Sequence, residues 1–379
     1  MKKQLLTLGF SVMATAASAQ VLETQSANDY LHFSFPIAQA NKLDASKAFN
    51  AISNEYHMEV TGAQLNKGIA LNTTQSKIAV LVSNAGKSTA LDTGLLQLKA
   101  AGKSMVENRV SSEQLAQVGM FANTVALTTR EDAARGALTL QTEQALGLSD
   151  KYIVQVKEKN SPYTLSVSLP TQSYTESDKV IARGAMLNRG KAFASGATSA
   201  QLVAPNGEVS QVSVKVNGTD IEFSAADQAN IISPINGLYE LRVQSKGSND
   251  GLSIQRNAKV AFALARETAS LNGASLSEKD GLHANVRLLA KEAGRFEVRG
   301  VLYGTNDRGQ LVPVMETHAA QNTNAGADSI KLPFDAAILA KAGVNAPYEL
   351  RDVRLFDQKQ MGLIDNLGKS VAFGGNTNM

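Results

Sequence analysis

The sequence has no cysteine and no tryptophan, and aromatic residues make up only 5% of the chain. Without cysteine there are no disulfides, no thiolate metal ligands and no thiol nucleophile, so the fold depends on buried apolar side chains. The scarcity of aromatic rings weakens an interpretation as a sugar-binding protein, because sugar platforms rely on tryptophan and tyrosine faces. The His-Glu-x-x-His and Gly-x-Ser-x-Gly motifs are absent as well, so the signatures of zinc proteases and serine hydrolases are missing.

A strong charge of either sign is also lacking. The 37 Lys and Arg residues nearly balance the 34 Asp and Glu residues. A balanced chain offers no electrostatic attraction to nucleic acid or to an anionic membrane surface. Downstream of Gln20, no run approaches the roughly 18 apolar residues that a membrane span requires. We therefore expect no nucleic-acid partner and no membrane insertion of the mature chain.

The first residues have the pattern of an export signal. Lys2 and Lys3 form a positive start, Leu5–Ala16 is a mostly apolar core, and Ala17-Ser18-Ala19 has the small residues of a cleavage site. This pattern predicts a signal peptide at residues 1–19, removed on export to the periplasm or the extracellular space. The alternative is an uncleaved membrane anchor, which the short apolar core disfavours.

The stretch Gly237–Leu264 has the pattern of two neighbouring strands, with alternate apolar residues from Tyr239 to Val243 and again from Ala258 to Leu264. A related signature recurs at Ala346–Asp357, where the alternation changes phase part-way. One extra residue near Arg351-Asp352 restores the register, which predicts a β-bulge at this point.

Short strands separated by turn signals about every ten residues are typical of β-sandwiches. We therefore expect a mainly β protein with three domains after the signal peptide. An N-terminal β-rich (α+β) domain with one or two short helices is expected at residues 20–170. Two immunoglobulin-like β-sandwiches are expected at residues 171–269 and 270–379, the second with a short helix near residues 335–342.

Local patterns add detail to the expected N-terminal domain. Tyr30–Phe35 predicts a first strand, and Ser111 with Gln114 forms a capping box that starts a helix. Tyr163–Leu169 predicts the last strand of the domain, followed by a linker at Pro170–Ser173. A further helix is expected behind Asp44 from the spacing of Ala45, Ala48, Phe49 and Ile52.

Several segments, taken in order, carry a resemblance to known proteins. They are SNEYHMEVTGAQLNKGIAL (Ser53–Leu71), YIVQVKEKNSPYTL (Tyr152–Leu165), YTESDKV (Tyr174–Val180), GLYELRV and PYELRDVRL. Together they resemble the secreted bacterial proteins grouped as domain of unknown function 4785. The resemblance implies an N-terminal domain followed by two immunoglobulin-like domains over nearly the whole mature chain, and it implies no activity. Gly237-Leu238-Tyr239 also resembles the tyrosine-corner region of immunoglobulin sandwiches.

Glu55, His57 and Glu59 form the one local constellation of ionisable residues. On a strand these side chains share one face at about 7 Å per pair, so they are weak candidates for a metal site or an acid–base pair, with His32 joining if its strand is adjacent. The alternative is a solvated strand face. Zinc sites usually contain more histidine ligands than carboxylate ligands, whereas this group has one histidine and two carboxylates. We therefore predict no catalytic, cofactor or metal site here.

Other patterns resemble binding loops but depart from the required spacing. Ala85–Thr89 has the end of a phosphate loop, yet Leu81 stands where the first glycine is required. Asn249–Gly251 and Asn322–Asp328 contain calcium-ligand residue types without the calcium-loop spacing, and are interpreted as turns. No cofactor is expected.

These observations favour a non-catalytic exported protein, in which the N-terminal domain binds a protein or surface ligand and the two sandwiches act as spacer or docking modules. β-Sandwich folds occur in proteins with many unrelated functions, so the fold alone does not indicate the function. The alternative is an exported hydrolase with a carboxylate-based site in the N-terminal domain, because two carboxylates about 5–9 Å apart leave no sequence signature. A purely structural surface or matrix component is the third hypothesis.

Overall fold

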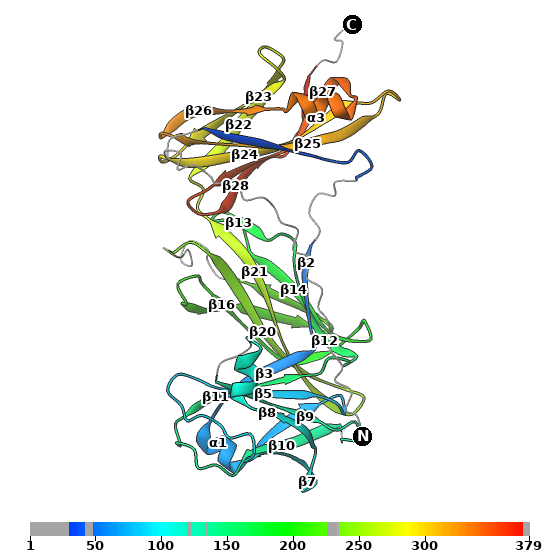
Figure 1. Ribbon diagram of the computed structural model, residues 1–379, viewed down its shortest axis with the longest axis vertical. Helices are drawn as coiled ribbons and strands as arrows, with labels where there is room; N and C mark the ends of the chain where they lie inside the picture. Colours follow the sequence, from blue (N-terminus) through cyan, green and yellow to red (C-terminus); the bar gives the residue numbers. More distant parts are fainter. Residues whose placement is uncertain are drawn as a thin grey trace.

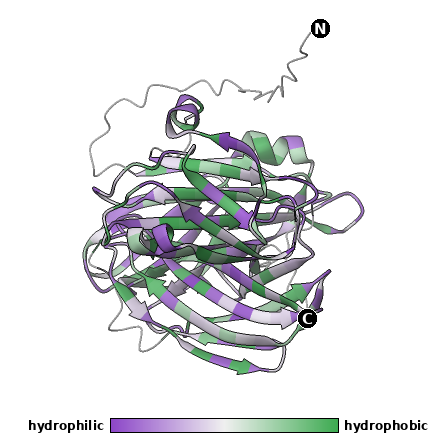
Figure 2. Ribbon diagram, turned by 90° about the horizontal axis from the view of Figure 1, so that it is seen from below, coloured by the Kyte–Doolittle hydropathy of each residue, from purple (hydrophilic) through white to green (hydrophobic). Residues whose placement is uncertain are grey.

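The computed structural model describes residues 30–41, 48–119, 123–133, 135–225, 233 and 235–373. The described chain is mainly β, as predicted, and forms three two-sheet sandwiches stacked along the long axis of the molecule (Figure 1). Each sandwich has its own apolar core. Hydrophobic and hydrophilic residues alternate along many strands (Figure 2), which is the pattern of sheets with one buried face. Among the described residues, no helix is both long and apolar enough to cross a membrane.

The first sandwich lies at the bottom of Figure 1. In spatial order, one of its sheets contains β3 (Glu55–Thr61), β11 (Lys151–Lys157), β5 (Ala79–Asn84), β9 (Thr124–Thr129) and β8 (Val106–Val110). The other sheet contains β4 (Ile69–Thr73), β10 (Gly136–Thr142), β6 (Leu96–Ala100) and β7 (Lys103–Ser104). The apolar side chains of both sheets meet in one core between them.

Two short helices in the first sandwich begin at capping boxes. The start of α2 (Ser112–Gln117) is the predicted one, because the Ser111 side chain accepts a hydrogen bond from the backbone N–H of Gln114. Helix α1 (Gly62–Lys67) begins in the same way at Thr61 and was not expected from the sequence. Satisfying the free N–H groups of the first turn lets such short helices form next to a sheet.

The middle sandwich has one sheet of six strands and one of five. The first contains β18 (Ser213–Asn217), β19 (Asp220–Ser224), β14 (Ile181–Asn188), β12 (Tyr163–Leu169) and β2 (Phe49–Ser53), with β15 (Lys191–Phe193) paired to β14. The second contains β13 (Ser173–Thr175), β21 (Leu252–Ala265), β20 (Leu238–Asn249), β16 (Ser195–Val203) and β17 (Val209–Gln211). Strands β20 and β21 are the predicted neighbouring pair and run antiparallel.

The third sandwich lies at the top of Figure 1. Its larger sheet contains β1 (Leu31–Pro36), β25 (Leu311–Thr323), β24 (Gly294–Thr305), β27 (Asn345–Asp357) and β28 (Gly362–Leu367), with β29 (Val371–Phe373) paired to β27. Its smaller sheet contains β22 (Ala269–Ser277), β23 (His283–Ala290) and β26 (Gly326–Pro333). Helix α3 (Ala336–Ala342) begins at the N-cap Asp335, which confirms the predicted short helix.

Strand β27 contains the predicted bulge. Arg299 of β24 faces Arg354, whereas Val301 faces Arg351, so two steps along β24 match three along β27. Asp352 takes a φ of 52° at this point. The extra residue restores the alternation, and the apolar residues on both sides of the bulge reach the core.

The N-terminal chain runs alongside the third and middle sandwiches before it enters the first. Strand β1 is confirmed, and it pairs with β25 of the third sandwich instead of with a strand of the first. Strand β2 pairs with β12 of the middle sandwich, so Phe49–Ser53 is a strand and not part of the expected helix. Asp44 and Ala45, where that helix was expected to begin, lie outside the described residues.

Strand β12 is confirmed as a strand, but it belongs to the middle sandwich. It lies between β14 and β2, and its Leu165 and Val167 are in the middle core. Pro170–Ser173 therefore does not link two domains, because it carries the chain from one sheet of the middle sandwich to β13 in the other. The middle sandwich begins before the expected boundary at residue 171.

Tyr239 has the contacts of a tyrosine corner. Its hydroxyl accepts a hydrogen bond from the backbone N–H of Ser233 at 2.5 Å, and its ring stacks on Phe262. A tyrosine that bonds to the backbone a few residues upstream is a hallmark of immunoglobulin sandwiches. The immunoglobulin-like topology of the two later sandwiches stays a prediction, and the expected leader at residues 1–19 lies outside the described residues.

The middle and third sandwiches are joined by Arg266–Thr268 and touch each other directly. The side chain of Gln360 accepts a hydrogen bond from the backbone N–H of Arg266 at 2.8 Å and donates one to its carbonyl oxygen at 3.1 Å. A Cβ atom at Gly362 would lie 2.7 Å from the Cβ of Ala265. Only glycine permits this close approach between β28 and β21.

Candidate functional site

A polar groove of about 750 Å³ lies where the first and middle sandwiches meet. Strands β3 and β11 of the first sandwich contribute Glu55, His57 and Gln155. The middle sandwich contributes three strands that lie side by side in one sheet, β16, β20 and β21. The end of β2 closes one side with Ala51, Ile52, Ser53 and the following Asn54.

The wall from the middle sandwich consists of two polar rows that cross three strands. By strand register, Ser199, Gln244 and Asn257 form one row. Gln201, Arg242 and Lys259 form the other row. The apolar row between them, Ala200, Val243 and Ala258, is buried in the middle core. Because strand side chains alternate between the two faces, burying the apolar row turns both polar rows outward.

The wall from the first sandwich follows the same rule. Tyr56 of β3 is buried in the first core, so its neighbours Glu55 and His57 point away from that core. His57 lies directly opposite Gln155 in the pairing of β3 with β11. The groove therefore brings an imidazole, an amide and a carboxylate to face the two polar rows of the middle sandwich.

The charged groups around the groove are paired with one another. Glu240 accepts hydrogen bonds from Arg242 at 2.7 Å and from Lys259 at 2.9 Å, and these bonds lower the pKa of its carboxyl. Glu55 lies 3.6 Å from Lys157. Arg242 and Lys259 share the one carboxylate of Glu240, so this cluster keeps one net positive charge. The other hydrogen-bonding groups of the lining are mainly uncharged, namely glutamine and asparagine amides and serine hydroxyls.

His57 is held toward its neutral form. Burial lowers its pKa, and the positive charges of Arg242 and Lys259 act in the same direction, while Glu55 opposes them. A neutral imidazole has one donor and one acceptor nitrogen. At neutral pH, His57 therefore serves as a hydrogen-bonding group in the groove and not as a cation.

Asn257 offers an unused acceptor. Its side chain is only 7% exposed, and Nδ2 donates to the carbonyl oxygen of His57 at 3.5 Å. Its Oδ1 atom is buried and has no hydrogen-bond partner among the described residues. Leaving a buried acceptor without a donor costs about 1–3 kcal/mol, so an incoming N–H or O–H group gains by bonding to this atom once the side chain turns toward the groove.

The sequence candidates for a metal or acid–base site do not converge. Glu59 lies 2.8 Å from Lys151, so its carboxylate is engaged in an ion pair. His32 is on β1 of the third sandwich and not on a strand next to His57. The described part of the chain has no group of three or more His, Cys, Asp or Glu side chains placed to hold a metal ion.

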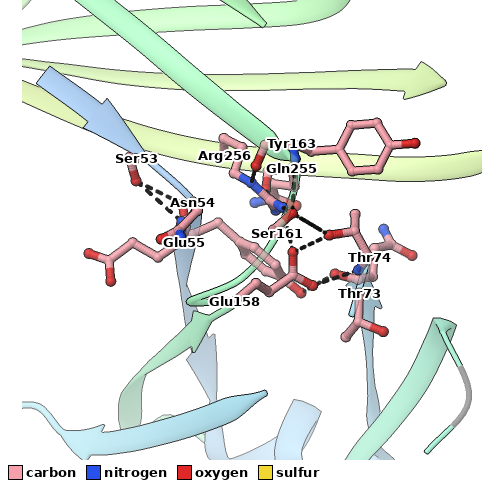
Figure 3. A network of polar contacts seen from close by, with 12 residues as sticks. Ser53, Asn54, Glu55, Thr73, Thr74, Glu158, Ser161, Tyr163, Gln255 and Arg256 are labelled. Carbon is pink, nitrogen blue, oxygen red and sulfur yellow. Dashed lines mark hydrogen bonds and ion pairs between the residues drawn. The ribbon is translucent and has the colours of Figure 1, made fainter. Parts of the chain in front are cut away.

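A buried ion pair fixes the first sandwich to the middle one (Figure 3). Arg256 of β21 and Glu158, which follows β11, bond directly and are both 0% exposed. Glu158 also accepts hydrogen bonds from the backbone and hydroxyl of Thr74, each at 2.6 Å. Arg256 donates to the carbonyl oxygen of Tyr163 at 2.9 Å and to the hydroxyl of Ser161 at 2.8 Å.

This network sets the geometry of the groove. Arg256 lies next to Asn257 in β21, and Glu158 follows the strand that carries Gln155. A buried charge pair is stable only when its remaining hydrogen-bonding positions are satisfied, which restricts the two sandwiches to one arrangement. The buried pair thus fixes the positions of the two walls of the groove relative to each other.

Comparison with known proteins identifies the family. The model for the N-terminal domain of DUF4785, a domain of unknown function, matches residues 23–158. The model for the C-terminal domain of the same family matches residues 268–374. The chain belongs to the DUF4785 family. The N-terminal match includes β1 and β2, so the family's N-terminal unit extends beyond the first sandwich into sheets of the other two.

Solved structures support the fold of this DUF4785 protein. A crystal structure of a DUF4785 family protein from Legionella pneumophila matches with a TM-score of 0.72 and 20% identity, covering 91% of this chain and 93% of that one. A Porphyromonas gingivalis protein of unknown function is 12% identical and covers 55% of this chain and 99% of its own, but its TM-score of 0.19 is too low to indicate a shared fold. No curated protein matches the chain.

Proposed function

We propose that this DUF4785 protein is an exported, non-catalytic binding protein whose ligand site is the groove between the first and middle sandwiches. The observation that carries the proposal is the groove itself, in which two polar rows from three strands of the middle sandwich face His57 and Gln155 of the first. A site of this kind has its binding groups in place before a ligand arrives. This differs from the expectation that the N-terminal domain alone binds the ligand.

The groove chemistry suits an extended peptide. Its amide side chains donate and accept hydrogen bonds, as a peptide backbone does. Its two polar rows run side by side across three strands. The lining contains no Tyr, Phe or Trp, so it lacks the flat apolar faces on which sugar rings stack. The one net positive charge of Arg242, Lys259 and Glu240 disfavours a strongly basic ligand, and the otherwise uncharged lining suits a polar one.

The hydrolase alternative finds little support in the groove. A glycosidase needs two carboxylates on opposite sides of the scissile bond, and Glu55 is the one carboxylate in the lining. Its neighbour along the strand, Glu59, is bound to Lys151. Hydrolytic turnover by the mature chain that is lost in Glu55→Gln would replace the binding proposal with this alternative.

A peptide-display library selected on the mature chain tests the proposal. Selection is followed by binding measurements on two matched variants, Gln244→Arg in the groove and Gln211→Arg on the exposed edge strand β17. We expect selected peptides to lose at least about tenfold in affinity for Gln244→Arg, because a long charged side chain fills the groove, and to bind Gln211→Arg as tightly as the parent chain. Equal affinity for both variants, or no selected peptides, would contradict the proposal.

Asn257→Leu gives a second, finer prediction. Leucine has a similar volume but no acceptor, so a peptide N–H that reaches Oδ1 loses its partner. We expect about a tenfold loss in affinity for the selected peptides, with only a small loss of thermal stability, because Oδ1 has no partner among the described residues and the bond from Nδ2 to the carbonyl oxygen of His57 is long, at 3.5 Å. Calorimetric titration and a melting curve measure the two effects. Unchanged affinity would exclude Asn257 from ligand contact.

Export is part of the proposal and has its own test. The positive start, apolar core and small residues of the first 19 positions support cleavage before Gln20. We expect mass spectrometry of the protein from its producing cells to find Gln20 at the N-terminus. The variant Ala19→Arg should retain its leader, whereas Ser18→Ala should be processed normally. A parent protein that still begins at Met1 would rule out cleavage.

A further inference from the structure

Strand β1 forms an open edge of the largest sheet in the third sandwich. It pairs on one side with β25, from Leu31 opposite Ala320 to Pro36 opposite Met315. On its other side, no strand pairs with it among the described residues. Its free backbone N–H and C=O groups are thus available to another strand.

The side chains of β1 make this edge apolar. Leu31, Phe33 and Phe35 occupy alternate positions and are 38%, 50% and 51% exposed. The two phenylalanine rings contact each other edge-on, and both lie against the imidazole of His318. Ser34 points to the other face, where its hydroxyl lies 2.8 Å from that of Thr317. One face of the edge strand therefore presents a continuous apolar strip to solvent.

This edge differs from the other edges of the molecule in its exposed apolar surface. Strands β3, β8, β18 and β26 also end their sheets and each carries at least one charged residue, whereas β2, β4, β13, β17 and β22 end theirs without one. Of the uncharged edges, β2 and β17 each expose one large apolar side chain, whereas β1 exposes three. Charged side chains on an edge disfavour pairing with another chain, and β1 has none. An uncharged, apolar edge pairs with an identical copy without repulsion between like charges.

We propose that two copies of this protein pair through their β1 strands in antiparallel orientation about a twofold axis, independently of the groove. Centring the pair on Phe33 places Leu31 of each copy opposite Phe35 of the other, so all three apolar side chains find apolar partners. Centring it on His32 or on Ser34 places one of them opposite a residue outside the strand. Such an interface is self-complementary, and the two six-stranded sheets become one continuous sheet.

The expected dimer is weak, because a six-residue strand buries less surface than a standard interface of about 800 Å² per partner. Sedimentation equilibrium of the mature chain up to about 0.5 mM should show a rise from monomer to dimer mass. Phe33→Lys places two lysines face to face on the axis and should raise the dissociation constant at least about tenfold. Val209→Lys also replaces an exposed apolar residue with lysine, on the edge strand β17, and should leave the dissociation constant unchanged. A monomer at every concentration, or equal dimerisation of Phe33→Lys, would overturn the proposal.

Disulfide trapping tests the register, because the chain has no cysteine of its own. A residue on the twofold axis of an antiparallel pair faces its own copy with Cα atoms about 4.5–5.5 Å apart, which suits a disulfide. In mild oxidant, Phe33→Cys should cross-link faster than His32→Cys, Ser34→Cys or the control Val209→Cys. Cross-linking of all four at the same rate would contradict the pairing, and a melting curve for each variant checks that the third sandwich is intact.

Discussion

Arg256→Met is expected to lower the free energy of unfolding of the mature chain by about 3–5 kcal/mol. The substitution leaves the carboxylate of Glu158 fully buried, with the two hydrogen bonds from Thr74 but without its cation. Water cannot compensate for the loss, because neither side chain is exposed. Urea unfolding followed by circular dichroism measures the effect.

Two further variants test whether the loss of stability comes from breaking the buried ion pair or from removing a positive charge anywhere in the chain. Arg242→Met removes an equal charge from the exposed pair with Glu240 and should cost less than about 1 kcal/mol. The double variant Arg256→Met with Glu158→Leu should regain much of the lost stability, because replacing both partners with apolar groups leaves no unpaired buried charge. A loss below about 1 kcal/mol for Arg256→Met would show that the two sandwiches do not depend on this network.

Gly62→Ala is expected to destabilise the first sandwich by about 3 kcal/mol. A Cβ atom at Gly62, the first residue of α1, would lie 2.2 Å from the carbonyl oxygen of Gly147. That oxygen has little room to retreat, because Gly62 and Ala63 donate backbone hydrogen bonds to the nearby Asp150 and Leu148. The added methyl group therefore clashes with a carbonyl oxygen that neighbouring backbone hydrogen bonds hold in place.

The same unfolding measurement tests this prediction against a matched glycine. Gly368→Ala adds the same methyl group where the nearest atom, Oδ1 of Asn366, would lie 4.0 Å away, and should change stability by less than about 0.5 kcal/mol. If Gly62→Ala is as stable as Gly368→Ala, the close packing of α1 on the 147–150 loop is not present in solution.

Features set by a few neighbouring residues could be predicted from the sequence. The phase change near Arg351-Asp352 locates the bulge, the start of α2 follows from Ser111, and α3 follows from Asp335. The capping box at Thr61 carries the same signal as Ser111. It was missed because it directly follows the strand pattern of β3.

Features set by distant partners could not be predicted. The alternation in Tyr30–Phe35 shows a strand, yet nothing local shows that its partner is β25, nearly three hundred positions away. The spacing from Ala45 to Ile52 fits a helix, but pairing with β12 makes Phe49–Ser53 a strand. Tertiary pairing overrides local propensity in short segments of this kind.

The candidate site shows the same division. The shared face of Glu55 and His57 follows from strand alternation and is confirmed by their common place in the groove. The polar rows opposite them come from β16, β20 and β21, and no local pattern shows that these strands face β3. Arg256 stands between Gln255 and Asn257, so its neighbours give no sign that it is buried, and its partner Glu158 becomes apparent only in three dimensions.

The central claim is that the groove between the first and middle sandwiches binds the ligand. Hydrogen–deuterium exchange of the mature chain, with and without a selected peptide, tests it most directly. The account predicts slower exchange on binding in residues 199–201, 242–244 and 257–259, together with residues 53–57, and no change in β17. Protection confined to other surfaces, such as β1, or no protection at all, would contradict it.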